Sequence, residues 1–151
     1  MSGTARRDLG HGGPSEAARM IETLGLAPHP EGGWYRETWR DTASSAILYL
    51  LEEGGRSAWH RVGSPELWHW HAGASVEMSV TPETQWVLGP DVLGGELPQV
   101  VVPAGAWQTA TPRRGWALVG CTMAPPFTFD AFDLAPPGWE PPGWGAALGG
   151  A

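Results

Sequence analysis

Residues 54–73 read GGRSAWHRVGSPELWHWHAG and decide the fold. Glycines at both ends of this stretch suit tight turns, because a positive φ costs glycine little. The residues between the turns predict two short strands, and a period of two places His60 and Val62 on one face of the first strand. On the second strand the same period places an acid and two aromatic residues on one face: Glu66, Trp68 and Trp70. If these faces line the inside of a barrel, an imidazole and a carboxylate meet in an aromatic pocket.

The spacing of five residues in this stretch is the first sign of a family. Gly54, His60, Val62, Glu66 and Gly73 follow the pattern G-x5-H-x-V-x3-E-x6-G. This pattern resembles the first sequence motif of the cupin superfamily. Cupins that bind a metal carry a second histidine at the position that Val62 occupies here.

A second motif lies downstream, where residues 103–108 read PAGAWQ. The proline and the glycine resemble those of the second cupin motif, Pro-x-Gly-x-x-His, and Gln108 stands in place of its histidine. The resemblance therefore implies that two of the four cupin metal-ligand positions, Val62 and Gln108, are altered in this chain.

The segments around the two motifs narrow the resemblance to the cupin-5 family, formerly a domain of unknown function. The similarity runs from about Leu24 to Phe132 and implies a small barrel, compared by fold with sugar-nucleotide epimerases and storage proteins. In chain order the segments are LGLAPHPEGGWYRETWR, SAILYLLEEGGRSAWHRV, ELWHWHAG, LPQVVVPAGAWQTA and LVGCTMAPPFTFDAF.

Composition limits the classes of partner. The chain has 151 residues, 42% of them apolar, which predicts one domain with a real core. Its net charge is −7, and all nine basic residues are arginine, so nucleic acid is not an expected partner. Without lysine, Schiff-base catalysis and a P-loop are excluded.

Cys121 and the hydropathy pattern indicate the cellular compartment in which the protein is expected. The only cysteine cannot form an internal disulfide and lies in the apolar run WALVGCTMA, so we expect a buried thiol. No apolar run approaches 18 residues, and the N-terminus is polar and glycine-rich. We therefore expect a cytoplasmic protein without a membrane partner.

Periodicity and turn residues divide the chain into three parts. Residues 1–13 are expected to be a flexible leader, residues 14–134 the cupin domain, and residues 135–151 a flexible Pro/Gly-rich tail that is dispensable for folding. One helix is predicted after a Ser15 cap, ending at Gly25.

Short strands separated by Gly, Pro and Asp turns fill the rest of the domain, which predicts an all-β, double-sheet jelly-roll barrel with one N-terminal helix. Ten tryptophans and many valines exceed what such a barrel needs inside, so we also expect one sheet face to be covered in a homodimer. The predicted strands are 34–39, 45–51, 76–80, 85–88, 99–102, 107–109 and 116–123, besides the two in residues 54–73.

The candidate catalytic residues are His60 and Glu66, because a histidine and a carboxylate in an apolar pocket can have pKa values near neutrality. Gln108 is expected to orient a substrate by donating and accepting hydrogen bonds. The other candidate substrate-binding residues are Trp68 and Trp70 as walls, Arg36 as an anion contact, and Tyr49. His69 and His71 have the opposite parity from Glu66 and should face away from the pocket, as should Arg61 relative to His60.

Two classes of function remain open. The first is an enzyme that moves a proton on a small molecule, such as a sugar, aromatic or carbonyl compound, as an epimerase, isomerase or lyase does. The second is a module that binds such a molecule without chemistry. No cofactor is expected, and if a divalent metal binds weakly, His60, Glu66 and Gln108 are its candidate ligands.

Overall fold

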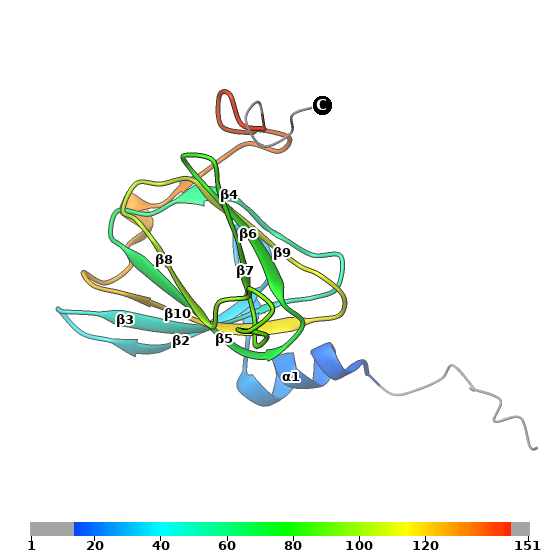
Figure 1. Cartoon of the computed structure of the whole chain (residues 1–151). Coiled ribbons are helices and arrows are strands. Elements are labelled where there is room, and N and C mark those ends of the chain that lie inside the picture. The colour runs from blue at the N-terminus through cyan, green and yellow to red at the C-terminus, as the bar shows by residue number, and fades with distance from the viewer. Residues whose placement is uncertain (1–13, 146–151) are drawn as a thin grey trace, which may run out of the picture.

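The computed structural model describes residues 14–145, so the predicted leader and the last part of the predicted tail lie outside the described residues. Two antiparallel sheets face each other and enclose the core (Figure 1). The larger sheet has the strand order β1-β2-β3-β10-β5-β8 and the smaller one β11-β4-β9-β6-β7. This arrangement confirms the predicted all-β, two-sheet barrel with one N-terminal helix.

The strands of the larger sheet are β1 (Ala27–Pro28), β2 (Trp34–Arg40), β3 (Ser45–Leu51), β5 (Glu66–Gly73), β8 (Gln99–Val102) and β10 (Ala117–Met123). Those of the smaller sheet are β4 (Ser57–Arg61), β6 (Val76–Val80), β7 (Thr84–Leu88), β9 (Gln108–Pro112) and β11 (Asp133–Leu134). The sequence predicted all of these strands except the two-residue strands β1 and β11.

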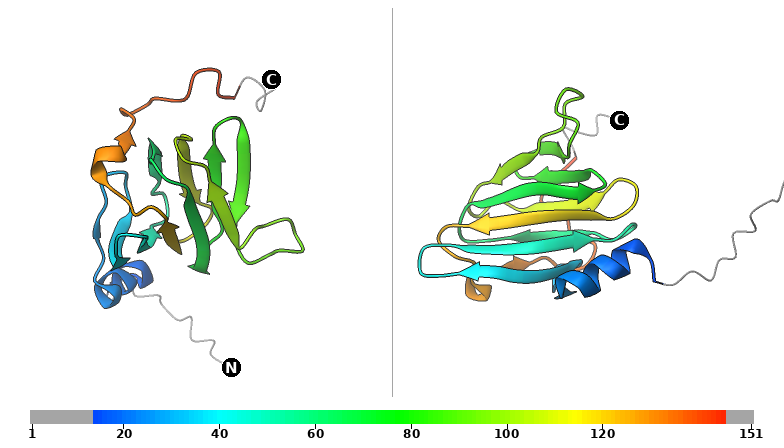
Figure 2. Two further views of the ribbon diagram at one scale, coloured as in Figure 1. Left: turned by 90° about the vertical axis from the view of Figure 1, so that its left-hand side faces the viewer. Right: turned by 90° about the horizontal axis from the view of Figure 1, so that it is seen from below.

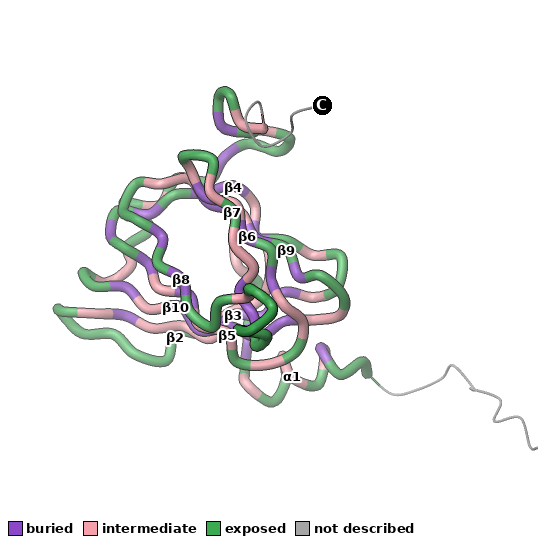
Figure 3. The backbone as a smooth tube through the Cα atoms, viewed as in Figure 1, coloured by how far each residue is buried: buried purple, intermediate pink, exposed green. Residues whose placement is uncertain are grey.

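The core lies between the inner faces of the two sheets. Strand β6 shows the alternation that the period of two requires, since Val76, Met78 and Val80 are buried while Glu77 is exposed. Buried segments accordingly alternate with exposed ones along the strands in Figure 3. Each fully buried aliphatic side chain contributes about 1.5–3 kcal/mol. The same cluster includes Tyr49, Leu51, Trp68, Leu88, Val100, Val102, Ala110, Ala117, Val119 and Cys121.

Helix α1 (Glu16–Leu24) begins and ends as the sequence predicted. The Ser15 hydroxyl accepts a hydrogen bond from the Ala18 amide at 3.1 Å, and Gly25 ends the helix with a φ of +66°. Ala17 is buried against Leu50 and Leu118 on the outer face of the larger sheet. The helix therefore covers one end of that face, as Figure 2 also shows.

The stretch of residues 54–73 places its two strands in different sheets. Strand β4 belongs to the smaller sheet and β5 to the larger one, so residues on their inner faces meet across the barrel. Gly73 ends β5 with a φ of +81°, and a Cβ there would lie 2.2 Å from the Trp116 carbonyl oxygen. Only glycine fits this close approach of two segments of the chain.

The segment after β10 returns to the edge of the smaller sheet. Strand β11 pairs with β4, with Leu134 opposite His60 and Asp133 opposite Arg61. The Arg61 guanidinium and the Asp133 carboxylate form an ion pair at 2.7 Å, but both are about half exposed, so its contribution is at most about 1 kcal/mol. The backbone pairing thus holds this segment beside His60.

The described part of the tail, residues 135–145, also reaches back to β4. The Ala135 amide donates to the Trp59 carbonyl oxygen at 2.9 Å, and Trp144 packs edge-on against Trp59 with ring centroids 5.0 Å apart. Trp139 packs against Trp107, with ring centroids 4.4 Å apart. Flexibility of the tail stays a prediction, but these contacts change what we expect from its removal.

Deleting residues 136–151 is expected to uncover Trp59, which is only 5% exposed in the structure. Uncovering one large aromatic side chain costs about 2 kcal/mol, which lowers the melting temperature of a chain of this size by roughly 4–8 °C. Differential scanning calorimetry measures this shift. Deleting only residues 146–151 removes none of the described contacts and is the matched control; equal melting temperatures for both truncations would show that these contacts contribute nothing.

Candidate functional site

His60 lies on the inner face of β4 and is 2% exposed. The β4–β9 register is irregular: Ser57 lies opposite Ala110 and His60 opposite Gln108, so three steps along β4 match two along β9. This bulge turns both Ser57 and His60 inward. The His60 Nδ1 lies 2.7 Å from the Glu31 Oε2 and 2.8 Å from the Ala58 carbonyl oxygen.

Glu31, which the sequence analysis did not select, is the partner of His60. It lies in the turn between β1 and β2, is 8% exposed, and accepts a hydrogen bond from the Ser57 Oγ at 2.6 Å. Its other oxygen lies 3.3 Å from the His29 Nδ1. The signal that could have identified it is the pair of glycines that follows: a Cβ on Gly32 would lie 2.2 Å from the Arg56 carbonyl oxygen, so only glycine lets this turn approach β4.

The charges of this pair stabilise each other. Burial opposes a charge on His60, but the charge and hydrogen bond of Glu31, together with the charge of Glu66 and the Ala58 carbonyl oxygen, outweigh it and raise the pKa of His60 to about 9. Burial likewise opposes a charge on Glu31, and the His60 imidazolium outweighs it and holds the pKa of Glu31 below its usual value. His60 is therefore an imidazolium at neutral pH, buried beside its counter-charge.

Glu66 is the first residue of β5 and is 7% exposed. Its Oε1 accepts a hydrogen bond from the Gln108 Nε2 at 2.8 Å and a longer one from the Trp68 Nε1 at 3.2 Å. The Trp68 Nε1 also lies 3.0 Å from the Gln108 Oε1. Because Glu66 and Gln108 come from opposite sheets, this network joins the two walls of the barrel.

Burial also raises the pKa of Glu66, because the nearby His60 charge and the two hydrogen bonds only partly offset the loss of solvent. Glu66 is thus a stronger base than an ordinary carboxylate. The electrostatic coupling runs in both directions, since Glu66 also raises the pKa of His60. A buried acid and a buried base lie within each other's field.

One atom of each side chain remains available for a ligand. Within residues 14–145 the His60 Nε2 and the Glu66 Oε2 make no hydrogen bond to protein. Every fully buried polar side-chain atom in these residues has a hydrogen-bond partner, so these two atoms are not fully buried. These two atoms therefore keep access to solvent. They are the positions at which a small molecule can meet an N–H donor and a carboxylate oxygen.

Aromatic rings surround this pair. Trp68 is 1% exposed and packs edge-on against Tyr49, with ring centroids 5.8 Å apart. The Tyr49 hydroxyl donates to the Gly32 carbonyl oxygen, and burial raises the pKa of Tyr49 well above its usual value, so this group stays a phenol. The Phe132 ring lies 5.7 Å from His60. Trp70 packs at the margin of the same core, and its indole N–H donates to the Ala74 carbonyl oxygen at 3.0 Å.

Arg36 is not part of this cluster. It is exposed on β2, and its Nη1 lies 3.3 Å from the carbonyl oxygen of Leu24 at the end of α1. The sequence analysis assigned Arg36 to the pocket because the alternation in β2 fits either face of the strand. In the structure Trp34 packs under the helix on the outer face, and Arg36, two residues later, lies on that same outer face.

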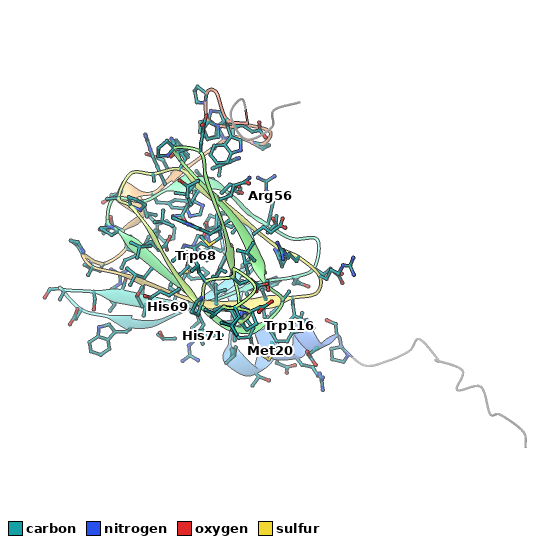
Figure 4. All side chains as sticks on the ribbon, in the orientation of Figure 1. Met20, Arg56, Trp68, His69, His71 and Trp116 are labelled. Carbon is teal, nitrogen blue, oxygen red and sulfur yellow. The ribbon has the colours of Figure 1, made fainter. Side chains whose placement is uncertain are left out.

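His69 and His71 face away from the pocket, as their parity predicted. The His69 Nε2 lies 3.0 Å from the Thr122 Oγ1, and the two imidazoles stack with centroids 6.5 Å apart. Figure 4 shows Trp68 between the sheets and both histidines on the side of the larger sheet that faces α1. Cys121 is buried, and burial raises the pKa of its thiol, so it is not a nucleophile.

The cupin resemblance implies a metal site at the positions of His60, Val62, Glu66 and Gln108. Within residues 14–145 no group of three or more His, Cys, Asp and Glu side chains has an arrangement that could hold a metal ion. Val62 offers no lone pair, and the Gln108 amide is already bonded to Glu66 and Trp68. The residues present do not fit a transition metal.

We therefore expect dialysis of the purified protein against a chelator to leave much less than one equivalent of any transition metal. Elemental analysis by mass spectrometry measures this ratio. A stoichiometric metal that disappears in a His60→Ala variant would contradict the expectation and make His60, Glu66 and Gln108 ligands.

Comparison with known proteins agrees with this architecture. The family model described as Cupin superfamily (DUF985), Cupin_5, matches residues 18–135. The crystal structure of protein SO0799 from Shewanella oneidensis is 36% identical, with a TM-score of 0.76 over 81% of this chain and 85% of that one. A hypothetical protein from Leishmania major is 28% identical, with a TM-score of 0.74 over 80% and 88% of the two chains.

A more distant likeness extends to DMSP lyase DddQ from Ruegeria pomeroyi, which is 18% identical with a TM-score of 0.51 over 66% of this chain and 47% of that one. At this identity the likeness shows the fold alone. No curated protein matches the chain. Within residues 14–145 the structure has no helix of the length and hydropathy that a membrane span requires.

Proposed function

Because the chain belongs to the cupin-5 family of the cupin superfamily, we propose that His60 and Glu66 transfer protons on a small molecule bound between the two sheets of the barrel. The reaction is removal and return of a proton next to a carbonyl, of the epimerase, isomerase or lyase type. The observation that carries the proposal is that a buried imidazolium on β4 and a buried carboxylate on β5 lie close enough to shift each other's pKa, although each is hydrogen-bonded to other partners.

Each side chain has one role. The Glu66 carboxylate takes the proton from carbon, and the electrons of that C–H bond move to the carbonyl oxygen. The His60 Nε2–H donates to the oxygen as negative charge develops there. Positioned acid–base groups of this kind contribute about a hundred- to ten-thousand-fold in rate.

Glu31 and Gln108 are positioning residues. Glu31 and the Ala58 carbonyl oxygen hold the Nδ1 side of His60, which leaves the Nε2–H to face the substrate. Gln108 and Trp68 hold one oxygen of Glu66 and leave the other free. The aromatic walls, Trp68 and Tyr49, favour a sugar, aromatic or carbonyl compound with a flat or apolar face.

The test is proton exchange in deuterated water. Wild-type protein is screened by mass spectrometry against sugar nucleotides and small carbonyl acids, and the proposal expects deuterium to enter one compound at the carbon next to its carbonyl. Compounds that bind, as judged by calorimetry, without any exchange would contradict it.

The second candidate function is a module that binds the same kind of molecule without chemistry. Two features favour it: the altered residues Val62 and Gln108, and the engagement of Glu66 Oε1 by both Gln108 and Trp68. Binding without exchange is its expected signature.

A further inference from the structure

A groove of about 610 Å3 crosses the outer face of the smaller sheet, on the side of β4 and β9 that faces away from His60. Its volume is within the usual range for ligand sites, roughly 300–1,000 Å3. The loop before β8 contributes Gly95 and Leu97 to one margin, and the tail contributes Glu140 and Trp144 to another. In the left view of Figure 2 the tail and this loop stand at opposite ends of the molecule, with the strands between them.

The floor of the groove is a row of short, uncharged polar side chains. Ser79 on β6 pairs with Thr109 on β9 and with Gln85 on β7, so the three side chains lie in line across the sheet. From β9 to β7 the row crosses two strand spacings, about 10 Å. The Thr109 hydroxyl already donates to the Ser57 carbonyl oxygen at 2.7 Å and accepts from Arg56, so it offers a ligand one remaining lone pair. Ser79 and Gln85 can both donate to and accept from a ligand hydroxyl group.

The charged residues at the groove balance one another. The Arg113 Nε donates to the Glu77 carboxylate at 3.1 Å, and the Arg56 guanidinium donates to the Thr109 hydroxyl at 3.1 Å. With Glu140, the lining holds two arginines and two glutamates. This balance, in a chain of net charge −7, favours a neutral ligand over an anionic one.

Two tryptophans, Trp59 and Trp144, lie where the C-terminal tail borders the groove. Trp59 is almost fully buried, and Trp144 packs edge-on against it while remaining partly exposed at the groove. A second cavity of about 430 Å3 lies under the tail and shares Arg56, Trp59 and Glu140 with the first, so the groove continues beneath the tail. An exposed indole face, with its negative quadrupole, attracts the polarised C–H groups of a sugar ring.

The backbone disfavours a peptide as occupant. A peptide that adds a strand needs a free sheet edge, but β4, β9 and β6 each have a strand on both sides. The edge strand β7 is partly covered, because the Leu97 amide donates to the Val87 carbonyl oxygen at 2.8 Å. Contacts here must come from side chains, and those present are hydroxyls, an amide and indoles.

From this floor, charge balance and tryptophan margin, we infer that the groove binds a neutral oligosaccharide, with its hydroxyl groups on Ser79, Thr109 and Gln85 and one sugar ring on Trp144. The site is separate from the barrel pocket and does not depend on the proton transfer proposed for it.

The test is a nuclear magnetic resonance titration of the full-length, 15N-labelled protein with cellohexaose, xylohexaose, maltohexaose and mannohexaose. The inference expects one of these to shift saturably the Trp144 indole N–H and the backbone amides of β6 and β9. Trp144→Ala should weaken that binding by about tenfold, a factor in line with the loss of one aromatic contact.

Trp39→Ala is the matched control, because Trp39 is 55% exposed on β2 of the other sheet, and it should leave the affinity unchanged. Glu66→Gln should also leave it unchanged, which separates this site from the barrel pocket. No saturable shift with any of the four sugars, equal losses in Trp144→Ala and Trp39→Ala, or tighter salt-sensitive binding of tetragalacturonate would each overturn the inference.

Discussion

His60→Ala is expected to reduce deuterium exchange into a bound compound by about a hundred- to ten-thousand-fold, while the affinity for that compound falls much less. The physical reason is that the imidazolium meets the developing negative charge on oxygen, which is absent in the ground state. Exchange is measured by mass spectrometry and affinity by calorimetry on the same preparation.

Glu66→Gln is the sharper variant of this pair. The amide has the shape of the carboxylate, and its oxygen can still accept from Gln108 and Trp68, but it cannot take a proton. We expect it to lose exchange to the same extent as His60→Ala. Glu37→Gln, an exposed carboxylate on β2, is the control and should exchange like wild type. Exchange that survives in both His60→Ala and Glu66→Gln would place the chemistry elsewhere.

Glu31→Gln is expected to have the largest effect on stability. It removes the counter-charge from a buried imidazolium, and breaking a buried ion pair costs about 3–5 kcal/mol. For a chain of this size that lowers the melting temperature by roughly 10 °C. Glu37→Gln is again the matched control: its ion pair with Arg40 at 2.8 Å is exposed, and its loss should leave the melting temperature nearly unchanged.

The stability lost in Glu31→Gln should depend on pH in a defined direction. The folded state raises the pKa of His60 from 6.5 to about 9, so this contribution is fully present below about pH 6.5 and is lost as the pH rises through about 9. The lowered pKa of Glu31 sets the acid limit, because its contribution is lost as the pH falls below about 4.5.

Denaturant unfolding of wild type and Glu31→Gln at about pH 6 and about pH 10 tests this window. The difference in unfolding free energy should be large at the lower pH and small at the higher one. An equal difference at both values would mean that Glu31 stabilises by packing rather than by charge.

The sequence predicted the barrel because its signals are local. Turn residues such as Gly54 and Gly73 mark strand ends, and the alternation within Val76–Val80 marks a buried face. The same period of two correctly placed His60, Glu66 and Trp68 inside and His69 outside. These inferences need only neighbours in the chain.

Glu31 could not be found in this way. It lies 29 positions before His60 in a turn that has no periodicity, and it becomes a partner only when strand β4 bulges and the glycines of the turn approach that strand. The tail contacts could not be found for the same reason, since nothing near Trp144 in the sequence indicates that it packs on Trp59. Contacts that depend on where distant segments meet leave no local pattern.

The ionisation state of His60 is the central claim, and a 15N nuclear magnetic resonance titration of its imidazole tests it most directly. In wild type both ring nitrogens should remain protonated through neutral pH and titrate with a pKa of about 9, and in Glu31→Gln the pKa should fall below that value. A neutral imidazole at pH 7 in the wild type, or a titration that Glu31→Gln does not move, would contradict the account.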